Sequence, residues 1–499
     1  MASQDIHGRF GPQRRIVGGL LQLLVFSAVA SGQPCFLPAV DVDISGGPRA
    51  LETADFNGDG RPDIVVSLAE TPDPATDEVA VMLGTGTGSF GPPTRYPVGI
   101  NPASVVVLDF NRDGRLDLAV ANGNELGTPP TTPDITFLAG DGTGGFSQAG
   151  NASVGGRAFD LAVADFNADS FQDLVVALYQ PPGTAILLGN GAGGFSNAVF
   201  HAAFSNVAAV DVGDFNRDGR VDFVATQDFQ GAEVWVYLGN GAGGFDSGTS
   251  HVAAIIPVDV LARDFNGDGL LDLAVSTISF LATLLATPTG FAPPVLHSVG
   301  PTPRGVTAFD VEGDGDLDLA IVTGGGTVAV LLGDGAGSFG PPFSFPVGSR
   351  PWAVISADFN LDGVPDLIST NYDSNDLSIL LQSPLGISPS TVPVSVVGIP
   401  FPTTTFVASG GTAPLTLTLT GALPPGLFFN PSTGTLSGTP TQAGSFSFSV
   451  TAQDALGCVR VQTYGLLIAA AIPTLAGWGL VLLSVALAGV GVLCLRRSG

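Results

Sequence analysis

The chain has 499 residues and a formal net charge of -27, and all 17 of its basic residues are arginine. Such an acidic chain lacks the basic surface that nucleic acids require, so no nucleic-acid partner is expected. The lack of lysine also excludes a lysine nucleophile or Schiff base. Hydrophobic residues make up 45% and glycine accounts for 69 residues, which favours short strands joined by tight turns in two or three domains.

Residues 1–32 are typical of a signal peptide. Three arginines precede an uncharged, mostly apolar stretch at 16–30, and Ala28 and Ala30 provide a small-x-small cleavage site. An N-terminal membrane anchor is the alternative, although the stretch is short for one. The sequence therefore predicts an exported protein.

Residues 33–382 contain a repeated acidic motif. Asp-x-Asn-x-Asp-Gly-x-x-Asp occurs seven times, with small departures, at intervals of 46 to 56 residues. A glycine-rich turn ending in phenylalanine runs in phase with it, 19 positions before the next motif. A period near 50 residues with several short strands is the size of a propeller blade. The sequence predicts an all-β fold with a seven-bladed β-propeller of four-stranded blades.

The phase of the repeat predicts how the ring closes. The last repeat stops at Gln382 without a glycine turn or a fourth strand, whereas the chain after the signal peptide begins with that missing piece, at 36–44. An open array would leave two unpaired sheet edges. We therefore expect the N-terminal strand to join the final blade.

The motif places oxygen donors at regular spacing around a tight loop. Carboxylates stand at positions 1, 5 and 9 and an amide oxygen at position 3, and the glycine at position 6 permits a sharp turn. Such hard donors suit Ca²⁺ better than Mg²⁺, which demands strict octahedral geometry. Simple Asx turns are the alternative, but seven copies with at least three acids each favour a cation.

The sequence thus predicts up to seven structural Ca²⁺ ions. Ser170 stands where the third motif should have glycine, so that site is expected to bind most weakly. The predicted metal ligands are Asp55, Asn57, Asp59, Asp63, Asp109, Asn111, Asp113, Asp117, Asp165, Asn167, Asp169, Asp173, Asp214, Asn216, Asp218, Asp222, Asp264, Asn266, Asp268, Asp272, Asp310, Glu312, Asp314, Asp318, Asp358, Asn360, Asp362 and Asp366.

This pattern resembles the FG-GAP/VCBS repeat of integrin-α-like propellers, from Phe36 to Gln382. The resemblance implies that the Asp loops hold structural calcium between neighbouring strands of a blade. It also implies that loops of the ring bind a ligand, although it assigns no ligand residues.

A second domain is predicted at 388–470, after a linker at 383–387. Its strands alternate cleanly, as at 445–450, and it is nearly free of acids. The segments 423–427 and 434–440 resemble the putative-Ig family of bacterial surface modules, which implies a small Ig-like β-sandwich. A spacer between propeller and membrane is the expected role, with carbohydrate or protein binding as the alternative.

The C-terminal segment 472–497 predicts membrane contact. The 21 residues from Leu475 to Leu495 are uncharged and apolar, long enough for one transmembrane helix, and Arg496-Arg497 follows. Ile472-Pro473-Thr474-Leu475 and the following order of features resemble the IPTL-CTERM sorting signal. The resemblance implies a Gram-negative host and an exosortase-type processing enzyme that delivers the protein to the cell surface. A plain tail anchor is the alternative.

No catalytic set stands out in the sequence. His201, His251 and His297 each lie six residues after a repeat phenylalanine, which predicts a structural place on the outer strands of three blades. No nucleophile elbow, zinc-protease motif or phosphate loop occurs. Whether Cys35 and Cys458 pair is left open by the sequence.

We therefore expect a surface adhesion or ligand-binding module for an extracellular protein or glycan, and not an enzyme. The main alternative is a secreted hydrolase or lyase with its site in the central channel. Acids, histidines or arginines in the channel, beyond the calcium ligands, would favour that alternative. A purely structural envelope component is the third hypothesis.

Overall fold

The computed structural model describes residues 34–69, 77–123, 133–202, 206–227, 232–253, 255–383 and 385–470. All regular elements in these ranges are strands, so the all-β prediction is confirmed. Among the described residues there is no helix of the length and hydropathy that a membrane crossing needs. The predicted signal peptide and the predicted C-terminal helix lie outside the described residues.

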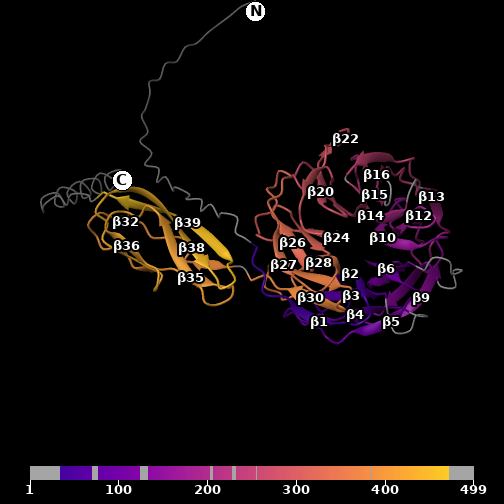
Figure 1. Cartoon of the computed structure of the whole chain (residues 1–499), viewed down its shortest axis with the longest axis horizontal. Helices are drawn as coiled ribbons and strands as arrows, with labels where there is room; N and C mark the ends of the chain where they lie inside the picture. The colour runs from indigo at the N-terminus through magenta and orange to yellow at the C-terminus, as the bar shows by residue number, and fades with distance from the viewer. Residues whose placement is uncertain are drawn as a thin grey trace, which may run out of the picture.

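The first domain consists of repeated four-stranded sheets, which fits a propeller. Within the described residues seven such sheets surround a common centre (Figure 1). Six of them are each built from one continuous stretch of chain. Their strands are β2 (Pro48–Ala54), β3 (Asp63–Leu68), β4 (Glu78–Met82), β5 (Thr94–Pro97); β6 (Pro102–Leu108), β7 (Asp117–Asn122), β8 (Ile135–Gly140), β9 (Phe146–Ala152); β10 (Ala158–Ala164), β11 (Asp173–Leu178), β12 (Gly183–Leu187), β13 (Val199–Ala202); β14 (Val207–Gly213), β15 (Asp222–Gln227), β16 (Glu233–Tyr237), β17 (Thr249–Val252); β18 (Pro257–Arg263), β19 (Asp272–Thr277), β20 (Leu281–Leu284), β23 (Val295–His297); and β24 (Pro303–Phe309), β25 (Asp318–Thr323), β26 (Thr327–Leu331), β27 (Phe343–Pro346). The fifth of these sheets carries a small extra hairpin, β21 (Ala286–Thr287) and β22 (Gly290–Phe291).

The remaining sheet joins the two ends of the domain. Three of its strands are consecutive, β28 (Pro351–Ala357), β29 (Asp366–Asn371) and β30 (Asp376–Leu380), and the fourth is β1 (Val40–Asp43). β1 runs antiparallel to β30, with Val40 opposite Ile379. The N-terminal strand therefore completes the last sheet, where the phase of the repeat placed it.

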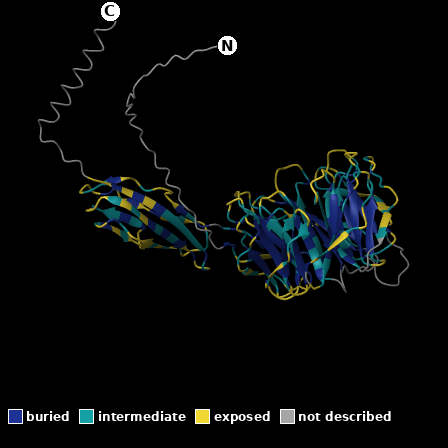
Figure 2. Ribbon diagram, turned by 90° about the horizontal axis from the view of Figure 1, so that it is seen from above, coloured by how far each residue is buried: buried dark blue, intermediate teal, exposed yellow. Residues whose placement is uncertain are grey.

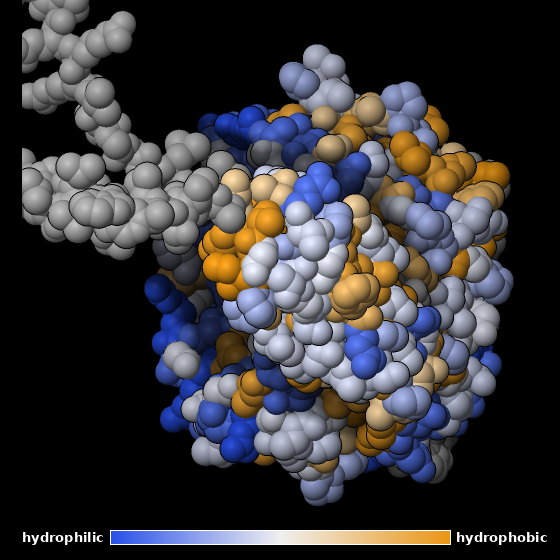
Figure 3. Space-filling model, turned by 90° about the vertical axis from the view of Figure 1, so that its left-hand side faces the viewer, coloured by the Kyte–Doolittle hydropathy of each residue, from blue (hydrophilic) through white to orange (hydrophobic). Residues whose placement is uncertain are grey.

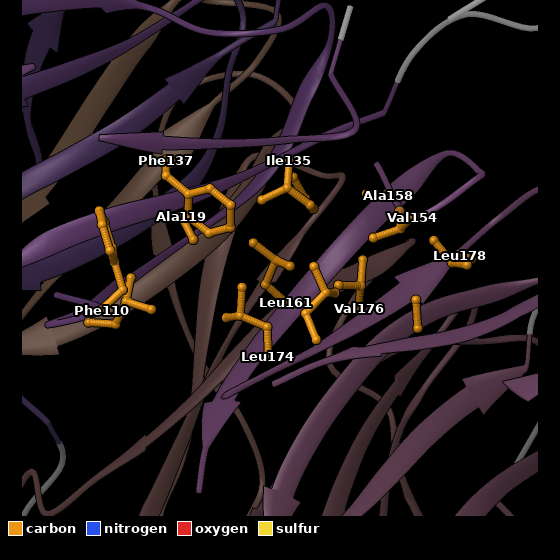
Figure 4. Packing of buried hydrophobic residues seen from close by; sticks show 14 residues of the cluster. Phe110, Ala119, Ile135, Phe137, Val154, Ala158, Leu161, Leu174, Val176 and Leu178 are labelled. Atoms are coloured by element: carbon orange, nitrogen blue, oxygen red, sulfur yellow. The ribbon is translucent and has the colours of Figure 1, made fainter. Parts of the chain in front are cut away.

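The core lies between neighbouring sheets. In the cluster of Figure 4, Phe137 and Ile135 of one sheet point toward Leu161, Leu174 and Val176 of the next. Another cluster packs the last sheet on the first. The second strand of every sheet is buried along its whole length, as the dark strands of Figure 2 illustrate. These strands can be apolar at nearly every position because both faces are covered.

The second domain packs two main sheets around an aromatic core. Phe406, Phe448 and Tyr464 are buried at its centre. Its strands are β31 (Gly386–Ser388), β32 (Ser395–Val396), β33 (Thr404–Thr405), β34 (Val407–Ser409), β35 (Thr416–Gly421), β36 (Leu427–Asn430), β37 (Thr435–Gly438), β38 (Gly444–Gln453) and β39 (Val459–Ala469). Seen from its side of the molecule, the surface is a mosaic of hydrophilic and hydrophobic residues (Figure 3).

The two domains meet where the described chain begins. Cys35, Leu385 and Cys458 form a small buried cluster. The Ser383 amide donates a hydrogen bond to the Cys35 carbonyl at 2.8 Å. The N-terminal segment is therefore held between the closing sheet of the first domain and the start of β39.

Candidate functional site

Each Asp motif forms the loop between the first and second strands of a sheet. In the first loop the two carboxylate oxygens of Asp55 accept the amides of Asp59 and Gly60, at 3.1 and 2.7 Å. The side-chain oxygen of Asn57 accepts the Asp59 amide at 2.9 Å, and Asp59 accepts the Arg61 amide at 3.0 Å. Positions 1, 3 and 5 therefore converge on one short piece of backbone.

The turn needs left-handed backbone at two positions. Gly58 and Gly60 have φ of 73° and 80°. In the third loop the same two positions are Ala168 and Ser170, with φ of 59° and 68°, so two residues with a Cβ adopt the conformation that glycine favours. The third loop thus keeps the shape of the others at a steric cost.

The aspartate at position 9 has a different place. Asp63 is fully buried and accepts the Phe56 amide at 3.0 Å and the Gly84 amide at 2.7 Å. Gly84 begins the following glycine-rich turn, and a Cβ there would lie 2.1 Å from the Pro62 carbonyl oxygen. This close approach explains why the glycine turn runs in phase with the Asp motif.

The same arrangement recurs around the domain. The position 9 aspartates are all fully buried, and each accepts the first amide of the turn that follows its sheet's third strand. These pairs are Asp117 with Gly140, Asp173 with Gly189, Asp222 with Gly239, Asp272 with Ala286, Asp318 with Gly333, and Asp366 with Gln382.

The predicted ligands therefore fall into two groups, three polar positions on each exposed loop and one buried carboxylate beneath it. Burial raises the pKa of Asp63, and the charges of Asp59 and Asp55 raise it further, while its hydrogen bonds lower it. The same causes raise the pKa of Asp117 to about 6. In the described ranges no three His, Cys, Asp or Glu side chains are arranged to hold a metal ion.

The sixth loop holds the clearest unsatisfied charge. Glu312 takes position 3, and both of its carboxylate oxygens are buried without a hydrogen-bond partner. Burial raises its pKa to about 7, helped by the charges of Asp318, Asp314 and Asp310. It lines a cavity of about 230 Å³ that also includes Arg460 of the second domain. The charge of Glu312 therefore lies among three other carboxylates of the same repeat.

The central channel contains a second set of acids, on the first strands of four sheets. Asp160 accepts the Val210 amide at 3.0 Å, and Asp211 accepts the Ala262 amide at 2.8 Å. Asp259 likewise accepts the Val306 amide of the next sheet, at 3.1 Å. These three acids therefore link the first strands of neighbouring sheets.

The fourth channel acid is Glu52, whose pKa is also raised. Burial raises its pKa to about 7, and the charge of Asp160 adds to the effect. Burial also raises the pKa of Asp160 to about 6 and that of Asp259 to about 7. These acids lie outside the repeated Asp motif, so its spacing does not predict them.

The three histidines lie on the outermost strands β13, β17 and β23, where their spacing placed them. Each ring meets a repeat phenylalanine edge to face, and His251 lies 5.0 Å from Phe291 between ring centroids. Burial lowers the pKa of all three. They pack on the scaffold and lie far from the channel.

Family comparisons match the same parts of the chain. The FG-GAP-like repeat matches residues 55–120, 165–225, 214–275 and 310–369. The chain carries FG-GAP-like repeats. A family described as Putative Ig domain matches 379–469, and the IPTL-CTERM motif matches 470–497. All three predicted resemblances are thereby confirmed.

Solved structures add little to this assignment. A putative alpha-galactosidase from Bacteroides fragilis is 28% identical over 17% of each chain, with a TM-score of 0.15. Raptor from Chaetomium thermophilum is 11% identical over 70% of this chain, with a TM-score of 0.48. The matches span only 17% and 29% of those two proteins. A comparison with curated proteins gives no match.

The FG-GAP-like repeats and the IPTL-CTERM motif together indicate an exported propeller protein that is anchored at the cell surface. The IPTL-CTERM motif further implies membrane association and processing by an exosortase-type enzyme.

Proposed function

We propose that the seven sheets are the blades of one calcium-loaded propeller, displayed at the surface of a Gram-negative cell as an adhesion or ligand-binding module. The observation that carries the calcium assignment is Glu312, a buried carboxylate with two unpartnered oxygens beside Asp310, Asp314 and Asp318. Carboxylates crowded in this way repel one another, and a hard divalent cation removes that repulsion.

The loop residues at positions 1, 3 and 5 would hold each ion, together with the buried carboxylate at position 9. Bound calcium supplies positive charge between the loop and the second strand. Because position 9 already ties the loop to the glycine turn, the ion would stiffen the connection between three strands of a blade. The ions are therefore proposed as structural, and the ligand of the whole protein would bind elsewhere on the ring.

Binding of a ligand is tested with the full chain on arrays of extracellular glycans and proteins, once with calcium and once with EGTA. The proposal predicts a specific signal that EGTA abolishes. An intact, calcium-loaded chain that binds none of the arrayed polymers would contradict the ligand-binding part.

A hydrolase or lyase is the second candidate, because acids and arginines do line the channel. Three of the four acids, however, are engaged with backbone amides of the neighbouring sheet. Glu52 would be the proton-transfer group in this candidate, because burial raises its pKa to about 7. The test is to incubate the chain with polysaccharides and measure new reducing ends or unsaturated sugar products. Products that form with the parent chain and not with Glu52→Gln would establish this candidate in place of a binding module.

The second domain, in the same proposal, is a spacer that holds the propeller away from the membrane. Its nearly acid-free surface distinguishes it from the propeller, and the IPTL-CTERM motif follows it directly.

A further inference from the structure

Three arginines gather at the mouth of the channel, at the start of the first strands and opposite to the Asp loops. The Arg304 guanidinium carbon lies 3.9 Å from the Trp352 ring centre, and those of Arg49 and Arg350 lie 5.2 and 5.6 Å from it. Arg49 and Arg350 also approach the Tyr372 ring, at 5.3 and 4.9 Å. Aromatic faces attract cations, so these two rings hold three like charges together.

This arginine cluster, Arg49, Arg304 and Arg350, is short of negative partners. Arg350 pairs with Asp373 at 3.2 Å, but among the described residues neither Arg49 nor Arg304 forms an ion pair. The Nε atoms of Arg49 and Arg304 are buried and have no hydrogen-bond partner. The chain has a net charge of -27, yet this cluster is locally positive, so it can attract an anionic ligand.

A cavity of about 420 Å³ gives that anion room. Arg49 and Arg304 line it together with Phe159 and Tyr179, whose ring centroids lie 5.0 Å apart in a stack. The Arg157 guanidinium lies over both rings, 5.6 and 5.5 Å from their centres. A second hollow of about 450 Å³ continues from Arg304 past Arg350. One wall of the site is thus cationic and another is aromatic.

The floor of the cavity carries hydrogen-bond acceptors. Asp160 and Asp259 line it, as does Ser104. Asp160 accepts the Val210 amide with one oxygen, and Asp259 accepts the Val260 and Val306 amides with one oxygen each. A carboxylate oxygen can accept a second hydrogen bond, so acceptor capacity is left for hydroxyl groups. The arginines can bind an acidic group, the aromatic rings can pack on a C–H face, and the carboxylates can accept hydrogen bonds from hydroxyl groups. An acidic sugar carries all three features.

We propose that the channel mouth binds the carboxylate-bearing sugar of an acidic glycan, with Arg304 and Arg49 on the carboxylate and Phe159 and Tyr179 against the ring. This inference rests on the proposed ligand-binding function and names its ligand class. Arginine suits the role because its planar guanidinium group can donate hydrogen bonds to both carboxylate oxygens at once.

The test uses the full chain in calcium, with binding followed by titration calorimetry and by tryptophan fluorescence. The probes are a short oligogalacturonide, free galacturonate, a neutral oligosaccharide of the same length, and poly-glutamate. The oligogalacturonide should bind more tightly than the neutral sugar and lose affinity as salt is added. Weaker binding of free galacturonate identifies the polymer as the source of the sugar, and equal binding identifies the monosaccharide.

Arg304→Gln should weaken oligogalacturonide binding by at least about tenfold, because a buried cationic contact is lost. Arg304→Lys should recover part of the lost affinity, because lysine keeps the positive charge but cannot form the bidentate hydrogen bonds of the guanidinium group. Arg95→Gln, on the outermost strand β5, is the matched control and should leave binding unchanged.

Three outcomes separate the ideas. Binding of neutral sugars that Arg304→Gln does not alter would overturn the acidic-sugar site and leave the proposed function standing. Equal binding of poly-glutamate would overturn the assignment to a sugar. A chain that binds no arrayed polymer at all would remove the proposed function itself.

A second inference rests on the two cysteines at the domain junction. Cys35 and Cys458 are 5% and 6% exposed, and they lie in the same small buried cluster. The Cys458 amide is fixed by the Asp454 carboxylate at 2.8 Å. Two buried thiols in contact in an exported chain are placed for oxidation.

We infer that Cys35 and Cys458 form a disulfide that ties the propeller to the second domain. The S–S bond forms as each thiol gives up one proton and one electron. An exported thiol–disulfide oxidoreductase accepts the two electrons, and its own disulfide becomes two thiols.

Alkylation of the denatured full chain, isolated from the cell envelope without reductant, tests this inference by mass spectrometry. Cys35 and Cys458 should be unlabelled until a reductant is added, whereas Cys494 in uncleaved chain reports that the reagent works. Labelling of both junction cysteines before reduction would overturn the disulfide.

Discussion

The first strand of every sheet has two ends that differ in kind. At the loop end the same residues recur around the ring, with the same Asx-type hydrogen bonds and the same buried aspartate at position 9. At the mouth the corresponding residues are of five different types: they are Arg49, Ala103, Phe159, Ala208, Val258, Arg304 and Trp352. Both ends belong to the same seven strands, so the fold alone does not dictate the difference.

Repetition and divergence thus separate two tasks within one strand. A feature repeated in every sheet serves each sheet, which is what a scaffold requires. A feature that occurs once makes one position on the ring different from the other six, which is what recognition of one ligand requires. This contrast agrees with the two proposals, structural ions at the loop end and a specific ligand site at the mouth.

The loop end should tolerate small changes poorly. In Gly84→Ala the new Cβ would meet the Pro62 carbonyl oxygen at 2.1 Å, so unfolding free energy should fall by about 2–3 kcal/mol. Gly150→Ala on β9 is the control, because a Cβ there meets no atom within 4 Å and stability should change by less than about 0.5 kcal/mol. Urea unfolding in calcium measures both, and equal stability of the two variants would contradict the proposed packing.

The channel should respond to pH through Glu52. Its folded pKa of about 7 lies above its ordinary value of 4.5, so the folded chain binds the proton more tightly than the unfolded chain. The stability that Glu52 contributes is therefore fully present at low pH and is lost as pH rises through about 7. Between about pH 5 and about pH 8 the loss should be of the order of 2 kcal/mol at constant calcium.

Glu52→Gln should flatten that part of the pH profile, measured by urea unfolding at each pH. Asp160, Asp211 and Asp259 also have raised pKa values and give slopes of the same sign, so a residual slope is expected. An unchanged profile in Glu52→Gln would show that Glu52 titrates normally.

The smallest effect is expected in the third loop. Ser170→Gly removes a side chain from left-handed backbone and should stabilise the chain by about 1 kcal/mol. Gly114→Ser in the second loop, where φ is 79°, should cost a similar amount. Thermal unfolding of the two variants measures both changes in stability. A Ser170→Gly variant no more stable than the parent would contradict the steric argument.

The loop end could be predicted from sequence because its signal is local and repeated. The spacing of the Asp motif, its glycine turn and the missing last strand predicted the repeated sheets and the role of β1. Spacing could not show that Asp63 is buried, because its second partner, Gly84, lies in the next turn. Nor could it show that Arg460 of the second domain lines the same cavity as Glu312.

The mouth escaped prediction because its residues are far apart in the chain. Arg49, Arg304 and Trp352 each follow the proline that opens a first strand, at Pro48, Pro303 and Pro351. Aligning the repeats on that proline would have put the three at one level of the channel. The closing of the ring then makes their sheets neighbours, and only the structure shows how the side chains converge.

The most direct test of the account is thermal unfolding of the full chain in EGTA, in millimolar calcium and in millimolar magnesium. One ligand at 100 times its dissociation constant stabilises by about 2.7 kcal/mol per site, so several sites should raise the melting temperature strongly. The account predicts that large rise with calcium and little with magnesium. Identical melting in all three would contradict the calcium assignment and leave the Asp loops as turns held by their own backbone.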